Sequence, residues 1–245
     1  MLIGEDYPKI KIQLGNYLVY EPNVFITDVL MSIACFLFAY HIYKSITYKS
    51  EFMKWWSLFF LIFGFSSLAG ALGHAFFHYW GPEGKVICWL TSVIAVYAIE
   101  RAMISKLIEV KFYNFFVLLS KIKMAYFMGY LLLICFYFSS NYIDTKGFTP
   151  IAINTIGSVF LSAGFVGWYL SKRLNSHYKW FIYGVCMMVP AAFIFLMKIS
   201  FFRWFDKNDL SHLFITLGFF LFYKAIKLIE SENKEPIFND VLSVE

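Results

Sequence analysis

The chain has 245 residues, of which 60% are hydrophobic, 22% aromatic and only 15% charged, and its mean hydropathy is +0.64. Soluble domains carry about 45 to 50% apolar and roughly 25% charged residues, so this chain has more apolar surface than it could bury in water. The composition excludes a disordered protein, a secreted disulfide scaffold and most soluble enzymes. It predicts an all-α integral membrane protein, in which the net charge of +5 gives no reason to infer nucleic acid as a partner.

Seven apolar segments are long enough to cross a bilayer, since about 30 Å of hydrocarbon needs roughly 20 residues of helix. The stretch 111–123 is shorter and flanked by charge, which favours either an interfacial helix or an extension of the fourth span. We therefore expect one seven-transmembrane-helix domain over 1–230 and a polar tail over 231–245. The expected spans are 23–43, 55–80, 85–105, 123–142, 149–170, 178–203 and 208–229.

The distribution of basic residues predicts the orientation of these spans. Of the 21 Lys and Arg residues, 14 fall on the side of the first, third and fifth loops and the C-terminal tail. Because basic residues are retained on the cytoplasmic side, we expect the N-terminus outside and the C-terminus in the cytoplasm. The Phe-, Ile- and Lys-rich composition is typical of an AT-rich genome, which favours a bacterial inner membrane.

Polar residues gather at the predicted outer ends of the second and seventh spans. His74 and His78 are four residues apart and so on one helical face, with Ser67 two turns earlier. In the seventh span Asp209 stands three residues before His212. Ionisable groups in hydrocarbon are costly, so this layer is the candidate functional site. Four further charged residues belong to the same layer: Glu21, Asp28, Glu83 and Lys198.

Charged residues near the cytoplasmic ends of the spans have a simpler interpretation. Glu100 and Arg101 lie near the end of the third span, and Lys224 lies near the end of the seventh. Long side chains in such positions reach the interface by snorkelling. We therefore expect them to carry no site.

Imidazole nitrogens together with a carboxylate are the ligand set of catalytic zinc, where three protein ligands leave one position for water. His74, His212 and either His78 or Asp209 could hold the ion, and the remaining residue could orient a ligand or act as general base. Two other interpretations are open. The residues could form a hydrogen-bonded polar plug without an ion, or a histidine from each helix could bind haem, which is disfavoured because haem bundles usually offer more histidine pairs.

Seven spans, an outside N-terminus and these histidines resemble the alkaline ceramidase and CREST superfamily of membrane hydrolases. Glu21-Pro22-Asn23 is similar to the Glu-x-Asn of the ceramidase N-terminus, and the resemblance implies calcium near Glu21 and Asn23. His74 matches the histidine of the family's second helix, with Ser66 and Ser67 near its serine. His212 followed by Leu217-Gly218 is similar to the second histidine of the family's His-x-x-x-His and the Leu-Gly after it.

The sequence departs from the family at three positions. Asn208 replaces the first histidine of the seventh helix, Gly70 replaces the serine one turn before the second-helix histidine, and the third helix has Lys85 where the family has an aspartate. His78 and Asp209 could supply the missing ligand, and Glu83 the missing acid.

Together these features predict a metal-dependent hydrolase, with zinc as the expected metal, that acts on a lipid amide or ester near the outer membrane face. Ser67 and Asp209 are the expected catalytic residues, and His74, His78, His212 and Asp209 are the expected metal ligands. The expected partner is membrane lipid. The alternative is a non-enzymatic protein with a polar histidine cluster: a receptor, a small transporter or a partner subunit.

Overall fold

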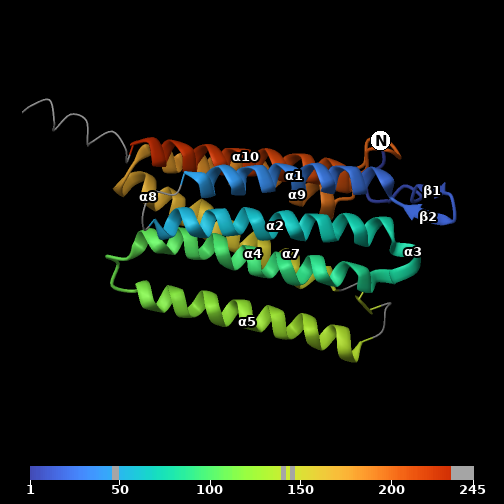
Figure 1. Cartoon of the computed structure of the whole chain (residues 1–245), viewed down its shortest axis with the longest axis horizontal. Helices are drawn as coiled ribbons and strands as arrows, with labels where there is room; N and C mark the ends of the chain where they lie inside the picture. The colour runs from blue at the N-terminus through green and yellow to red at the C-terminus, as the bar shows by residue number, and fades with distance from the viewer. Residues whose placement is uncertain (46–49, 139–141, 144–146, 233–245) are drawn as a thin grey trace, which may run out of the picture.

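The computed structural model describes residues 1–45, 50–138, 142–143 and 147–232, so most of the predicted tail lies outside the described residues. Apart from one short hairpin, the regular elements of the described residues are helices, and the long ones run side by side in an elongated bundle (Figure 1). Among the described residues, seven helices are long and apolar enough to cross a membrane. The prediction of seven spans is confirmed, and the chain has the features of a multi-pass integral membrane protein.

The chain begins with a short hairpin and continues as a series of helices. The hairpin consists of β1 (Lys11–Leu14) and β2 (Tyr17–Tyr20), and the helices are α1 (Pro22–Lys44), α2 (Glu51–Ala75), α3 (Phe77–Trp80), η1 (Gly81–Lys85), α4 (Val86–Ile104), η2 (Ser105–Leu107), α5 (Tyr113–Tyr137), α7 (Phe148–Val159), the π-helical η3 (Phe160–Val166), α8 (Gly167–Arg173), η4 (Ser176–Tyr178), α9 (Lys179–Leu196) and α10 (Lys207–Glu232).

Several predicted boundaries are corrected; the sixth span, for example, ends with α9 at Leu196 rather than at 203. Two corrections bear on the polar residues. The fourth span, α5, begins at Tyr113 rather than at 123, so of the two interpretations of 111–123 the structure shows the helical extension. The second span, α2, ends at Ala75 rather than at 80, and the short helix α3 follows it. The first correction places Lys123 well inside a span, and the second changes where His78 lies.

The centre of the bundle is packed with aromatic side chains from α2, α9 and α10. Trp56 stacks on Phe181 with ring centroids 5.0 Å apart, and both rings are fully buried with Phe222. Helices α9 and α10 approach closely because Gly184 and Gly218 face each other, and a Cβ on either would lie 2.9 Å from the other's carbonyl oxygen. These contacts fix α10 beside α9 and α2.

Helix α5 lies at one edge of the bundle, beside α4 (Figure 1). Most of its large apolar side chains are exposed, as expected for a helix that faces lipid. Lys123 of α5 is hydrogen-bonded to Glu100 of α4 and to Ser158 of α7. Glu100 was expected to snorkel to the interface, but its side chain is only 12% exposed because this lysine pairs with it inside the bundle.

The hairpin closes one end of the bundle, which also carries α3, η1 and the start of α10 and which we call the hairpin end (Figure 1). Strands β1 and β2 pair antiparallel, with Lys11 opposite Tyr20, and Gly15 in the turn has a φ of 58°. The backbone amide of Leu18 donates to the hydroxyl of Tyr79 in α3, 2.9 Å away. The hairpin is thereby held against the end of α2.

Candidate functional site

The candidate site lies at the hairpin end, where α1, α2 and α10 pack together. Asp28 of α1 is at its centre, with a side chain only 5% exposed. The hydroxyl of Ser67 on α2 donates to the Asp28 backbone oxygen at 2.8 Å and lies 3.2 Å from its Oδ1. Nε2 of His212 on α10 lies 3.6 Å from the same Oδ1. Three helices from distant parts of the sequence therefore meet at one carboxylate.

The other nitrogen of His212 faces a hydroxyl of α1. Thr27 Oγ1 lies 3.0 Å from His212 Nδ1 and 3.1 Å from Asp209 Oδ1. The backbone oxygen of Val24 is also 3.1 Å from Oγ1, and the single hydroxyl proton can be donated to only one of these three acceptors at a time. Thr27, His212 and Asp28 therefore form a continuous sequence of a hydroxyl, an imidazole and a carboxylate.

The carboxylate of Asp209 is held by hydrogen-bond donors from two segments of the chain. Its side chain accepts a hydrogen bond from Asn23 Nδ2 at 2.7 Å and from the backbone amide of Asp206 at 2.9 Å, and the residue is 1% exposed. Asp206 in turn accepts bonds from the first amides of α10, as N-terminal capping residues do. Burial raises the pKa of Asp206, and the negative charges of Asp209 and Glu21 raise it further. The hydrogen bond from the Asn208 amide acts in the opposite direction but does not cancel this rise.

A second carboxylate–histidine pair lies beside the first, nearer the hairpin. His74 Nδ1 is 2.8 Å from Glu21 Oε2, and Lys9 Nζ is 3.3 Å from the same oxygen. Burial raises the pKa of Glu21, but the bond from His74 and the charges of His74, Lys9 and Lys85 outweigh it and lower the pKa to about 2. Glu21 is therefore a permanent anion under ordinary conditions.

Four of the sequence-predicted site residues, Ser67, His74, Asp209 and His212, lie at the hairpin end as expected. His78 does not join them, and the expectation that it shares a helical face with His74 is wrong. Helix α2 ends at Ala75, and the exposed His78 stacks on Tyr20 instead, with ring centroids 5.8 Å apart. No Gly or Pro follows the helix end before Gly81 to signal it, which is why the i, i+4 spacing was misleading.

The structure adds Thr27 to the site and gives Asp28 a central role in it. A signal for Asp28 was present, because a carboxylate inside an apolar span needs a partner. No sequence signal marks Thr27, since threonine is common in membrane helices. Gly70 also takes part, because a Cβ there would lie 3.3 Å from Asp28 Oδ2, so a larger residue would press on the carboxylate.

The described residues test how well this site would fit a metal. Within them, no group of three or more His, Cys, Asp or Glu side chains is arranged to hold an ion. His74 and His212 have separate carboxylate partners, Glu21 and Asp28. Glu21 and Asn23, the expected calcium ligands, also bond to different residues. The described residues therefore do not form the expected ligand sets, while zinc and calcium binding stay predictions and haem stays disfavoured.

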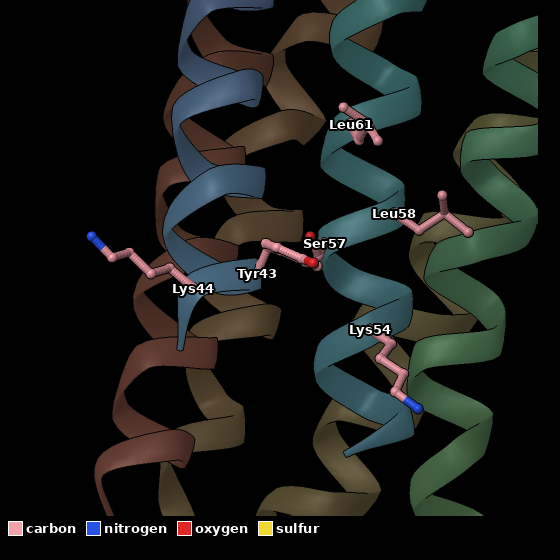
Figure 2. A pocket seen from close by; sticks show the side chains of 6 residues that line it. All are labelled: Tyr43, Lys44, Lys54, Ser57, Leu58 and Leu61. Carbon is pink, nitrogen blue, oxygen red and sulfur yellow. The ribbon is translucent and has the colours of Figure 1, made fainter. Parts of the chain in front are cut away.

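A groove of about 690 Å³ lies at the opposite end of the bundle, between α1 and α2 (Figure 2). Lys44 and Lys54 at its rim point away from each other (Figure 2), and Ser57 in its wall donates to the backbone oxygen of Ala39 at 3.0 Å. These side chains do not converge on a common point. The candidate site therefore remains the polar layer at the hairpin end.

Comparison with known proteins places this site inside a recognised family. Residues 23–231 match the Family of unknown function (DUF6962), so the match runs from the first turn of α1 almost to the end of α10. No curated protein and no solved structure matches the chain. Thr27, Asp28, Ser67, Asp209 and His212 all lie within the matched range. The chain belongs to the family of unknown function DUF6962.

Proposed function

We propose that this protein is an intramembrane hydrolase that cleaves a lipid amide or ester near the outer membrane face. The observation that carries the proposal is the alignment of Thr27, His212 and Asp28, in which a hydroxyl contacts an imidazole whose other nitrogen faces a buried carboxylate. This is the general arrangement of a nucleophile, a base and a group that orients the base. The excess of basic residues on the other side of the bundle supports an outer location for the hairpin end.

The chemistry follows from the roles of the three side chains. Asp28 favours the tautomer of His212 with a proton on Nε2, which leaves Nδ1 free to accept the proton of Thr27. Thr27 Oγ1 attacks the carbonyl carbon, its proton passes to Nδ1, and the bond to the leaving oxygen or nitrogen breaks as that atom takes the proton. Water, deprotonated by the same Nδ1, then releases the acyl group from Thr27 and restores the hydroxyl.

The surrounding residues act on this step through Thr27, His212 and Asp28. Asp209 accepts a hydrogen bond from Asn23 of α1 and thereby holds α1 against α10 beside Thr27, and Ser67 holds Asp28 from α2. Both are positioning residues in this proposal. Burial excludes water from the carboxylate, which strengthens its electrostatic effect on the imidazole.

The position of the site near one end of seven candidate spans supports a lipid substrate, because the polar backbone of a lipid lies near the ends of membrane-spanning helices. The similarity of His74, the nearby serines and His212 to the ceramidase pattern points to the same class of substrate. The step uses only groups of this chain, and zinc dependence stays a prediction to be tested separately.

The experiment is to reconstitute the protein in nanodiscs with defined glycerophospholipids and N-acyl lipids and to measure fatty-acid release by mass spectrometry. We expect Thr27→Val and His212→Gln to lower release by at least about 100-fold, because they remove the nucleophile and its base, while Thr27→Ser retains activity. His41→Gln, at the far end of α1, is the matched control. If both Thr27→Val and His212→Gln release fatty acid at the wild-type rate, the proposal is overturned.

Elemental analysis of the same samples, purified without chelator, tests the zinc prediction. About one zinc per chain that is lost in His212→Ala would add a metal to the site. The same zinc content in wild-type protein and His212→Ala would exclude His212 as a ligand.

A second candidate function is favoured by the internal pairing of both histidines. His74 and His212 each lie beside a carboxylate, Glu21 just before α1 and Asp28 within it, so each imidazole has an anionic neighbour in the absence of a ligand. Such pairs could join helices in a receptor, a small transporter or a partner subunit. Absence of release from every lipid of the panel, together with a protein that co-purifies at fixed stoichiometry, would favour this role.

A further inference from the structure

We propose that the hairpin end carries a binding site for a phosphate-bearing anionic lipid headgroup, formed by Lys9, Lys11 and Lys85 around the rings of Phe77 and Tyr20. This inference rests on the proposed function and deepens it, because it makes an anionic glycerophospholipid the substrate class of the site.

Three ammonium groups converge on two neighbouring rings. Nζ of Lys9 lies 4.5 Å from the centroid of Phe77, and Nζ of Lys85 lies 5.1 Å from the same centroid. Nζ of Lys11 lies 4.7 Å from the centroid of Tyr20, whose ring is 6.2 Å from that of Phe77. Cation–π contacts place all three ammonium groups beside these two rings, where one anion could contact more than one of them.

The three acids of the candidate site, Glu21, Asp28 and Asp209, are buried, whereas Lys9 and Lys11 are exposed and Lys85 is partly exposed. Glu83, two residues before Lys85, is an exposed acid of the same end. A ligand that approaches the two rings therefore meets ammonium groups before it meets the three buried carboxylates. Phosphate is the anion that lipids present at this depth, and lysine binds it as a point charge.

Exposed aromatic residues indicate that the cluster lies at headgroup depth. Tyr79 and Trp80 of α3 are 49% and 48% exposed, and Trp204, just before α10, is 53% exposed. Tyr and Trp concentrate where a membrane protein crosses the lipid–water interface. A lipid whose headgroup lies on the lysines would extend its glycerol and acyl chains toward the bundle.

Lys9 connects this cluster to the candidate site. Its Nζ is 3.3 Å from Glu21 Oε2, the oxygen that also contacts His74. Arg203, whose guanidinium donates to the backbone oxygens of Pro8 and Lys9, fixes the segment that carries this lysine. A headgroup on the lysines would therefore lie next to the polar layer that contains the reactive residues.

The experiment measures binding separately from hydrolysis. Thr27→Val protein in nanodiscs is irradiated with phosphatidylglycerol or phosphatidylcholine that carries a diazirine near its glycerol backbone, and the labelled peptides are identified. We expect phosphatidylglycerol to label segments 9–20 and 77–85 at least about fivefold more than phosphatidylcholine. Each of Lys9→Gln and Lys85→Gln should lower this preference by about fivefold, since each basic residue near the surface contributes on that scale.

Charge-preserving variants and a competing anion distinguish the possible causes of the labelling. Lys9→Arg and Lys85→Arg keep the charge and should keep the preference, which separates charge from folding. Labelling that survives excess inorganic phosphate supports a lipid headgroup, whereas labelling abolished by phosphate at constant ionic strength supports the site with free phosphate as its ligand. Equal labelling by both lipids, or a preference unchanged in both Gln variants, would overturn the proposal even if hydrolysis is observed.

Discussion

Nε2 of His212, on the last helix, lies 3.6 Å from Oδ1 of Asp28, on the first helix. Ser67 of α2 donates to the backbone oxygen of the same aspartate. The contact between His212 and Asp28 is long for a hydrogen bond, as is common between catalytic groups in the absence of substrate. Since the groups of the site come from three helices, the site forms only when α1, α2 and α10 are packed together.

Replacing Ser67 by Ala should loosen Asp28. The variant loses a buried hydrogen bond and leaves an acceptor unsatisfied, so we expect a loss of about 1–2 kcal/mol in the free energy of unfolding. Thermal unfolding in detergent measures this loss. Ser171→Ala is the control, because the hydroxyl of Ser171 is exposed and bonds only within its own helix. If Ser67→Ala unfolds at the same temperature as Ser171→Ala, Ser67 does not hold Asp28.

A methyl group at Gly218 should separate α9 from α10. The Cβ of Gly218→Ala would lie 2.5 Å from Met188 Cγ and 2.9 Å from the Gly184 carbonyl oxygen, so we expect a destabilisation of about 1–3 kcal/mol. Gly157→Ala is the matched control, because nothing lies within 4 Å of its Cβ, and a helix gains stability when Gly becomes Ala. Equal melting temperatures of the two variants would contradict the close crossing.

The stability of the hairpin end should depend on acid pH through Glu21. Its pKa is lowered from 4.5 to about 2, so the stabilisation is complete above pH 4.5 and is lost as the pH falls toward 2. Melting temperatures of the wild type and Glu21→Gln, measured between pH 2 and 6, should differ most at the upper end and converge at the lower end. A constant difference across this range would show that the ion pair with His74 does not stabilise the fold.

The contact of Lys123 with Glu100 should anchor α5. Lys123→Met leaves Glu100 buried without its cation, and we expect a loss of about 3–5 kcal/mol, part of which returns in the double variant with Glu100→Gln. Thermal unfolding in detergent provides the measurement. Lys121→Met is the control on the same helix, because its side chain is exposed. If Lys123→Met and Lys121→Met melt at the same temperature, the contact between Lys123 and Glu100 does not anchor α5.

The distribution of Lys and Arg predicts that the C-terminus lies in the cytoplasm. In a bacterial host, a fluorescent protein fused to the C-terminus should be fluorescent, while alkaline phosphatase fused at the same position should be inactive. An active phosphatase fusion would place the C-terminus outside, which would contradict the predicted orientation and the proposal that the hairpin end faces outward.

The sequence by itself determined the seven spans and the layer of polar residues at one end. Both follow from the cost of placing polar groups in hydrocarbon, which makes long apolar segments helical and makes each internal carboxylate or imidazole conspicuous. The positions of Ser67, His74, Asp209 and His212 at one end required only the alternating direction of the spans. Helix boundaries were less well determined, because no Gly or Pro directly follows the end of α2.

Only the tertiary structure decided which polar groups pair. The expected grouping brought His74 and His212 together around a metal, but the packing of α1 between α2 and α10 gives each histidine its own carboxylate, Glu21 and Asp28. The position of Lys123 was also decided by packing, since the sequence predicted it at the edge of the fourth span. Its charge excludes it from the membrane when α5 is considered alone, and only the packing of α4 beside α5 supplies Glu100, whose carboxylate offsets the cost of burying the ammonium group.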